Sequence, residues 1–187
     1  GFIPKTISNF TKNVEMIFNK KRDLLIVVGG GSLPPQLYDR PHEDELQPNR
    51  DRMEEQVIHY CVAHGIPIIA TCRGMQYINV MFGGKLWYHP KLPVTRTRGM
   101  DHQVWLVKEQ RNIWVNNYHS DCIYEEGLAS CFEPLAIDRE NHVVEAYGSD
   151  EMKILALQWH PERRFETANA YEETRKIILD FIQKYVK

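Results

Sequence analysis

Two short apolar runs, at residues 24–28 and 66–70, restrict the possible folds more than any other feature of the sequence, because each leads directly into a tight turn. An apolar run without alternating polar residues is typical of a strand that is buried on both faces of a sheet. The first run continues into three glycines at 29–31, where another group can approach the backbone closely. The second leads into Cys72 and then into a helical pattern. The sequence therefore predicts a strand, a sharp turn and a helix around Cys72.

Helical and strand-like patterns alternate along the rest of the chain, which is the signature of an α/β sheet with helices on its faces. The predicted helices cover residues 9–19, 49–64, 75–82 and 168–185. The other predicted strands cover residues 103–107, 113–115, 135–138, 143–147 and 154–158, and a hairpin turn is expected at 139–142. The loops at 34–48 and 89–102 are expected to shape a pocket, because binding residues are often carried on loops.

The length of 187 residues matches the usual size of one domain and is sufficient to enclose a hydrophobic core, so we expect a single domain over residues 1–187. The formal net charge is −2 and the basic residues are scattered, which argues against the large positive field that a nucleic-acid partner requires. No apolar run has membrane-spanning length and no signal segment opens the chain, so a cytoplasmic location and no membrane partner are expected.

The four cysteines form neither a paired framework nor the double C-x-x-C spacing of a zinc site, so reduced thiols are expected. His59, Cys61 and His64 lie in one predicted helix, where residues two apart point to different faces. We interpret them as ordinary helix residues and expect no metal and no cofactor. His89 and His102 are interpreted as structural or loop residues, which could lie near the mouth of a site.

Cys72 stands at the turn between a buried strand and a helix, where a nucleophile is exposed for attack. Backbone N–H groups at the start of that helix can hold a developing oxyanion. The helix N-terminus also favours the thiolate, so a lowered thiol pKa is expected. Taken alone, a cysteine after a strand is more often a small core residue. The functional interpretation of Cys72 therefore depends on its partners.

His160 and Glu162 supply such partners, because they follow the predicted strand at 154–158 and so project from an end of the sheet. Glu162 can accept the ring N–H of His160 and fix its tautomer, which leaves the other ring nitrogen free to take the thiol proton. Each residue alone is well explained as a strand-end histidine or a solvated acid. Together with Cys72 they form a set of nucleophile, base and orienting acid.

Four motifs across the chain resemble those of one family. They are Gly29-Gly30-Gly31, Cys72-Arg73-Gly74-Met75-Gln76, Asn117-Tyr118-His119-Ser120 and Gln158-Trp159-His160-Pro161-Glu162. In order and spacing they are similar to the motifs of the class I glutamine amidotransferase-like family, and the Cys-Arg-Gly-Met-Gln form looks most like the γ-glutamyl-γ-aminobutyrate hydrolase branch. The resemblance implies an open, mostly parallel, three-layer flavodoxin-like sheet flanked by helices, with a small antiparallel β portion.

The resemblance also implies a reaction, in which the thiolate attacks a γ-glutamyl carbonyl, a glutamyl thioester forms, the amine leaves and water releases glutamate. By that similarity His160 protonates the departing amine and later activates water. The implied oxyanion donors are the N–H of Arg73 and an N–H in the Gly30-Gly31 turn. The residues expected to hold the glutamyl α-amino and α-carboxylate groups are Gln76, Tyr118, His119 and Ser120.

The sequence departs from the family pattern in three places. Position 70 is Ala where the family usually has Gly, and Ser32 stands where Asp is common. The family also normally opens with another strand and helix, so either the sequence is N-terminally incomplete or its sheet lacks a strand and another segment covers the edge. A sheet without that strand has an exposed backbone edge.

Several alternatives remain open on the sequence alone. Arg73 can help to bind substrate, or it can pair with a carboxylate such as Asp51 or Glu54. The chain can be a free-standing hydrolase of a small γ-glutamyl substrate, a glutaminase subunit that feeds ammonia to a separate synthase, or a non-catalytic binding member of the fold. The leading substrate is γ-glutamyl-γ-aminobutyrate, but the leaving amine is not fixed. A homodimer is only the default expectation for a soluble assembly.

Overall fold

The computed structural model describes residues 3–8, 13–14, 17–19, 22–38, 46–88 and 99–186. Its helices are α1 (Pro48–His64), α2 (Arg73–Met81) and α3 (Ala170–Tyr185), with short 3₁₀ turns at Pro35–Leu37 and Glu125–Gly127. Its strands are β1 (Leu25–Val27), β2 (Ile68–Thr71), β3 (Trp87–Tyr88), β4 (Asp101–Leu106), β5 (Arg111–Asn116), β6 (Asp121–Cys122), β7 (Glu133–Asp138), β8 (Val143–Ser149) and β9 (Ile154–Leu157).

Seven of the strands form one mixed sheet in the order β1-β2-β9-β8-β7-β4-β5, and β3 pairs with β6 separately. β1, β2 and β9 are parallel, and the remaining pairs in the large sheet are antiparallel. An open sheet flanked by helices is the predicted fold class, which is confirmed. Antiparallel pairs outnumber parallel pairs among the described strands, so the antiparallel portion is larger than the sequence indicates.

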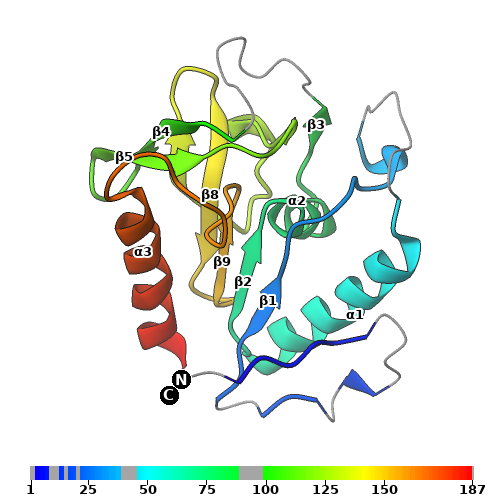
Figure 1. The fold of residues 1–187 in the computed structure, drawn as a ribbon. Helices are drawn as coiled ribbons and strands as arrows, with labels where there is room; N and C mark the ends of the chain where they lie inside the picture. Colours follow the sequence, from blue (N-terminus) through cyan, green and yellow to red (C-terminus); the bar gives the residue numbers. More distant parts are fainter. Residues whose placement is uncertain are drawn as a thin grey trace.

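Helices cover both faces of the sheet and create two apolar cores (Figure 1). α1 and α2 lie on one face, where Met53, Ile58 and Ile78 pack with the inward side chains of β1 and β2. α3 lies on the other face, where Ile178 and Phe181 pack near residues of β4, β5 and β9. The layers place the carboxyl ends of the parallel strands at one edge, which is where open α/β sheets bind their ligands.

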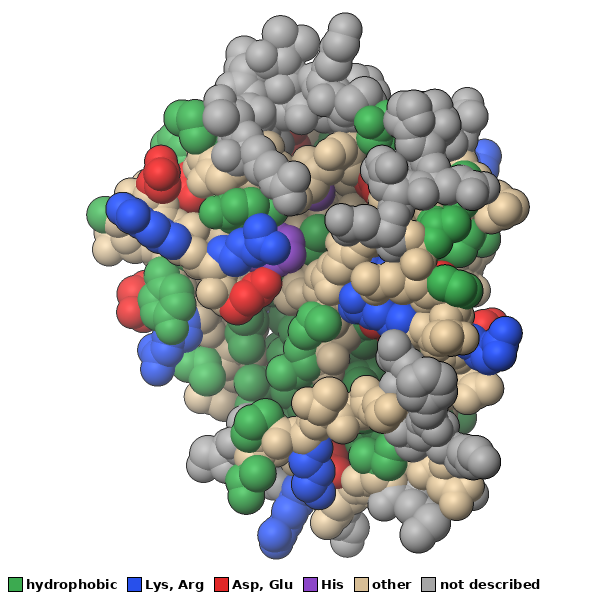
Figure 2. Space-filling view, turned by 45° about the vertical axis from the view of Figure 1, so that its right-hand side comes forward, with side chains coloured by type: hydrophobic (Ala, Val, Ile, Leu, Met, Phe, Trp, Pro, Cys, Tyr) green, Lys and Arg blue, Asp and Glu red, His purple; other side chains and the backbone are tan. Residues whose placement is uncertain are grey.

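β1 corrects one expectation, because this strand is buried on one face only. Leu25 and Val27 are buried, whereas Ile26 is 58% exposed and the following Val28 is 55% exposed. Figure 2 shows hydrophobic side chains lying open in the middle of this side of the molecule. β1 is the last strand in the described sheet order, so its outward side chains lack the cover that a more central strand would have. An apolar run indicates a strand but does not indicate its neighbours.

Most predicted elements are present, with bounds that shift by a few residues. α1 ends at Gly65, whose φ of 63° is the left-handed conformation that terminates helices. The predicted helix at 9–19 falls largely outside the described residues, as do His89 and most of the loop at 89–102. Part of the loop at 34–48 is outside them too. Within the described part of the chain, no helix combines the length and apolar character needed to span a bilayer.

Candidate active site

Cys72 occupies a sharp elbow between β2 and α2, as the sequence predicts. Its φ of 50° and ψ of −112° lie outside the regions that residues with a side chain normally adopt. Two backbone hydrogen bonds hold it there: the Cys72 N–H donates to the Leu157 carbonyl at 2.8 Å, and the Gln76 N–H donates to the Cys72 carbonyl at 3.1 Å. A strained residue that its neighbours hold in place is typical of a functional position.

The thiol of Cys72 is not activated by the helix N-terminus alone, contrary to expectation. Burial raises its pKa to about 11, although a hydrogen bond from the Arg73 backbone N–H and the charge of Arg163 both lower it. Cys72 is only 8% exposed. Removing a thiolate from water costs more free energy than a hydrogen bond from one backbone N–H recovers. The resting sulfur is therefore a thiol, and its activation requires a base.

His160 lies just beyond the end of β9 and has the geometry of such a base. Its Nδ1 is 2.6 Å from Oε1 of Glu162, so Nδ1–H donates to the carboxylate and Nε2 is left to accept a proton. Burial lowers the pKa of His160 below its usual 6.5, and the Glu162 hydrogen bond and charge oppose that shift. At neutral pH the site therefore holds a thiol and a neutral imidazole.

Gly29 lies against both Cys72, the predicted nucleophile, and His160, the predicted base. A Cβ placed on this residue would lie 2.7 Å from Cε1 of His160 and 3.5 Å from Cβ of Cys72. The backbone of the glycine turn thus lies against both side chains, and only a residue without a side chain fits. The sequence predicts a close approach at this turn. The structure identifies the approaching groups as Cys72 and His160.

Asn116, at the end of β5, was missed by the sequence analysis. Its Oδ1 accepts from the His160 N–H and its Nδ2 donates to the His160 carbonyl, both at 2.9 Å. Asn116 is fully buried, so these two bonds hold the backbone of the base rigidly. The rings of Tyr118 and His160 are nearly perpendicular, with their centres 5.7 Å apart. The Arg163 guanidinium lies 4.4 Å from the centre of the tyrosine ring.

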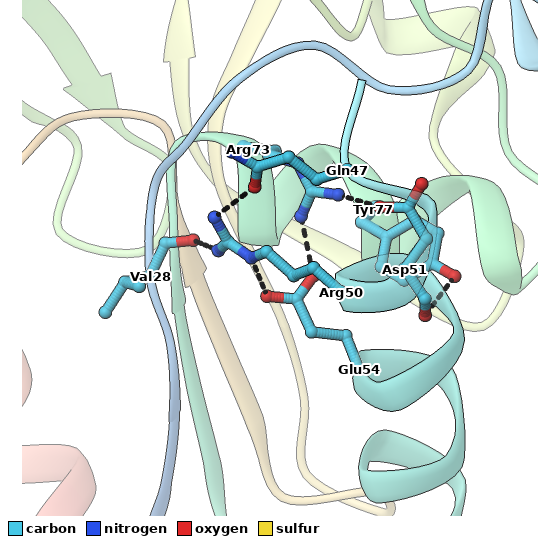
Figure 3. Close-up of polar contacts among 7 residues, drawn as sticks. All are labelled: Val28, Gln47, Arg50, Asp51, Glu54, Arg73 and Tyr77. Carbon is cyan, nitrogen blue, oxygen red and sulfur yellow. Dashed lines mark hydrogen bonds and ion pairs between the residues drawn. The ribbon is translucent and has the colours of Figure 1, made fainter. Parts of the chain in front are cut away.

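The side chain of Arg73 belongs to an ion-pair network that we call the arginine cluster, formed by Arg50, Asp51, Glu54 and Arg73 (Figure 3). Arg73 pairs with Asp51 through Nη2 and with Glu54 through Nη1 at 2.6 Å. Its side chain is 1% exposed, so these carboxylates satisfy a buried charge. Of the two interpretations of Arg73, the structure supports pairing with Asp51 and Glu54 for its side chain.

Arg50 links the arginine cluster to the glycine turn. Its Nε bonds Glu54 at 2.6 Å, and its Nη2 donates to the Val28 carbonyl at 2.6 Å, immediately before Gly29 (Figure 3). A Cβ on Gly30 would collide with Nη1 of Arg50. The arginine cluster therefore fixes the position of the glycine turn relative to the elbow. Arg50, which makes this link, was not singled out by the sequence analysis.

The predicted substrate-binding residues lie around the same site, but two of them face inward. Nε2 of Gln76 donates to the Asp121 carbonyl at 3.0 Å and to Oε1 of Gln158 at 3.1 Å. Nδ1 of His119 donates to the same Asp121 carbonyl at 3.0 Å. Ser120 is exposed and Tyr118 half-buried. The roles of these four residues, and of the N–H groups of Gly30, Gly31 and Arg73, stay predictions.

A family model described as peptidase C26 matches residues 6–162. Among curated proteins, the chain is 30% identical to glutamine amidotransferase-like protein YvdE of Lactococcus lactis, over 78% of this chain and 68% of the relative. It is 26% identical to the γ-glutamyl-γ-aminobutyrate hydrolase PuuD of Escherichia coli, over 80% of this chain and 67% of the relative.

The fold also matches a solved structure, described as a GMP synthase protein from Thermoplasma acidophilum. The TM-score is 0.66 with 19% identity, and the match covers 96% of this chain and 81% of the other. This likeness concerns the fold. The family match covers most of the sequence, including the elbow and the His160 motif, and it confirms the resemblance seen in the motifs. The chain therefore belongs to the peptidase C26 family of glutamine amidotransferase-like hydrolases.

Proposed function

We propose that this protein is a cysteine hydrolase that cleaves the γ-glutamyl amide bond of a small γ-glutamyl amine and releases glutamate and the amine. The observation that carries the proposal is the arrangement at Gly29, whose backbone lies against both the strained Cys72 and the ring of His160. A buried thiol beside a neutral imidazole, which itself donates to Glu162, is the arrangement that nucleophilic catalysis by cysteine requires.

The first half of the reaction forms a thioester. Nε2 of His160 takes the proton of the Cys72 thiol as the sulfur attacks the γ-carbonyl carbon, and the carbonyl oxygen becomes an oxyanion. When this tetrahedral intermediate collapses, His160 gives the proton to the departing amine nitrogen and the C–N bond breaks. Glu162 stabilises the imidazolium that exists between these two transfers, because its carboxylate accepts the Nδ1–H bond.

The second half regenerates the enzyme. His160 takes a proton from water as the water oxygen attacks the thioester carbonyl, and the resulting intermediate releases glutamate with the Cys72 sulfur as leaving group. The imidazolium then returns its proton to the sulfur. Both halves form an oxyanion at the same place, for which the N–H groups of Arg73 and of the Gly30-Gly31 turn are the proposed donors. The contact between the Arg73 N–H and the thiol supports that placement.

The glutamyl part of the substrate offers an α-amino group and an α-carboxylate for recognition. We assign their recognition to the side of the site formed by Gln76, Tyr118, His119 and Ser120, which lies next to the base. The name of the relative PuuD supports γ-glutamyl-γ-aminobutyrate as the substrate to test first. The amine is expected to contact the loops at 34–48 and 89–102, which differ in sequence more easily than the elbow does.

The test is to measure glutamate release from a panel of γ-glutamyl amines and from glutamine, with wild type, Cys72→Ala and Cys131→Ala. Cys131 is the exposed cysteine and serves as the matched control. The proposal requires release from γ-glutamyl amines that Cys72→Ala lowers by about 10³-fold or more, whereas Cys131→Ala retains it. A glutamyl adduct on Cys72, seen by mass spectrometry in trapped turnover, would establish the thioester.

Two outcomes would overturn the proposal. Turnover of glutamine but not of any γ-glutamyl amine would indicate a glutaminase subunit that supplies a separate synthase. Binding of γ-glutamyl amines without turnover by the wild type would indicate a non-catalytic member of the fold.

A further inference from the structure

Glu145 is a fully buried acid that the proposed mechanism does not use. It lies in the middle of β8, where its side chain is 0% exposed. An isolated carboxylate in such a position is very costly, so its neighbours must compensate its charge. Two imidazoles lie at ion-pair distance from it: Nε2 of His102 is 3.4 Å, and Nε2 of His119 is 3.6 Å, from Oε1 of Glu145. We call Glu145, His102 and His119 the histidine cluster.

The contacts of His119 determine where its protons are. Nδ1 faces the Asp121 backbone carbonyl at 3.0 Å, and a carbonyl only accepts, so Nδ1 must carry a proton. Nε2 faces the carboxylate of Glu145 at ion-pair distance, and a bare nitrogen lone pair there would repel the carboxylate oxygen. These two contacts favour a proton on both ring nitrogens of His119.

The other two members of the histidine cluster are consistent with this assignment. Burial by itself raises the pKa of Glu145, but the positive charges of His102 and His119 outweigh burial and bring the pKa well below its usual value. The acid is thus a carboxylate at neutral pH.

The segment that carries His119 also clamps the base. Asn116 bonds both sides of the His160 backbone, and Tyr118 contacts the His160 ring. Glu145 is tied to the same region, because its carbonyl accepts from the Gln158 N–H at 2.7 Å, two residues before His160. The positive end of the His119–Glu145 pair therefore has a fixed position relative to His160.

We propose that Glu145 is a positioning residue that holds His119 doubly protonated, so that the segment clamping His160 also places a fixed positive charge beside the base. The inference rests on the proposed function, in which His160 is that base. The charge opposes the addition of a second proton to His160, which keeps the imidazole free to accept the thiol proton. The charge of His119 indeed contributes to the lowered pKa of His160, after the larger effects of burial and Arg163.

Other charged and titratable groups face this region, and the experiment must separate them. They are His102 on β4, Asp121 and Cys122 on β6, Cys72 at the elbow, and Glu162 and Arg163 after β9. Glu162 acts on His160 in the opposite direction, since its carboxylate raises the pKa of the base. Replacing Glu145 and replacing Glu162 should therefore have opposite effects on the pH profile.

The first experiment reads protonation directly and needs no catalysis. The ¹⁵N signals of the His119 ring, assigned by their loss in His119→Gln, are measured at neutral pH in wild type, Glu145→Gln and His102→Gln. The wild type and His102→Gln are expected to show a doubly protonated His119 ring, and Glu145→Gln a singly protonated one. A singly protonated His119 in the wild type overturns the inference, even if Glu145→Gln does not fold.

The second experiment measures how loss of the Glu145 carboxylate changes the pH at which His160 becomes protonated. The acidic limb of the kcat/KM profile should move to higher pH in Glu145→Gln, because His160 then binds its second proton more easily. The plateau should fall by less than about tenfold, against about 10³-fold or more for Cys72→Ala. His102→Gln is the matched control, with the limb unmoved. An unmoved limb in folded Glu145→Gln overturns the inference, whereas absence of wild-type turnover refutes only the proposed function.

Discussion

The arginine cluster and the histidine cluster contact different parts of the candidate site, and they differ in what maintains their positive charges. The guanidinium groups of Arg50 and Arg73 stay charged at any ordinary pH. The charge on His119 depends on a proton that Glu145 helps to retain. The first cluster touches the turn and the elbow, and the second touches the segment that holds the base. Near neutral pH the cations of the arginine cluster therefore stay charged, whereas the positive charge of the histidine cluster changes when a proton leaves His119.

The largest expected effect comes from breaking the buried part of the arginine cluster. Arg73→Met leaves two carboxylates without their shared cation, and the free energy of unfolding should fall by about 3–5 kcal/mol. Urea unfolding measures the loss. Arg175→Met is the control, because Arg175 and Glu172 form a pair whose side chains are 55% and 67% exposed. That variant should lose less than about 1 kcal/mol. Equal losses would contradict the assignment of Arg73 as a buried structural cation.

The next effect separates two adjacent glycines. Gly29→Ala places a methyl group against His160, and a displaced base should lower kcat/KM by about 100-fold. Gly30→Ala meets the end of the Arg50 side chain instead, which can shift only by weakening its hydrogen bonds, and it does not meet His160, so its loss should be smaller. Steady-state kinetics on both variants, with circular dichroism to verify folding, measure the difference. A greater loss for Gly30→Ala would mean that the arginine side of the turn matters more than the base.

A smaller effect is expected from Arg50→Met, which removes the bond to the Val28 carbonyl while leaving Arg73 paired. The glycine turn is then held less firmly, and kcat should fall by about tenfold, equivalent to about 1.4 kcal/mol of lost transition-state stabilisation. KM should change little, because Arg50 is not assigned to substrate. The exposed Arg52 on the same helix provides the control Arg52→Met. A change confined to KM would argue against a positioning role.

The clearest change in direction is predicted for Glu162→Gln. Glu162 raises the pKa of His160, so its removal lowers that pKa, and the acidic limb of kcat/KM should move to lower pH. The plateau should fall far less than the roughly 10⁴-fold loss known for a buried orienting carboxylate, because this side chain is 59% exposed. A pH–rate profile measures both. A limb that moves to higher pH would contradict the assigned orientation.

The sequence predicted those parts of the site that depend on neighbours along the chain. The strand, turn and helix around Cys72 are local, and so is the bond between His160 and Glu162, two residues apart. The exposure of Ile26 could not be predicted, because an apolar run does not indicate whether another layer covers the outward face of the strand. The raised pKa of Cys72 was also missed, since the burial of the thiol depends on the surrounding tertiary structure.

The residues that hold the base were missed because their partners are distant in sequence. Asn116 bonds His160 across 44 positions, and no local pattern indicates such a contact. Glu145 did carry a signal, because an acid inside the apolar strand at 143–147 has to be compensated when that strand is buried. The identity of the compensating groups, His102 and His119, depends on how β4 and the segment after β5 fold against β8.

The high pKa of Cys72 has a consequence for chemical reactivity. A sulfur that keeps its proton at rest reacts slowly with alkylating reagents and peroxide, both of which attack thiolates. General thiol reagents should therefore label the exposed Cys131 before the nucleophile. A glutamyl derivative that carries an electrophile would instead bind in the site. The Cys72 sulfur would attack that electrophile as His160 takes the thiol proton. Selective covalent inhibition should thus depend on recognition of the ligand rather than on the intrinsic reactivity of its warhead.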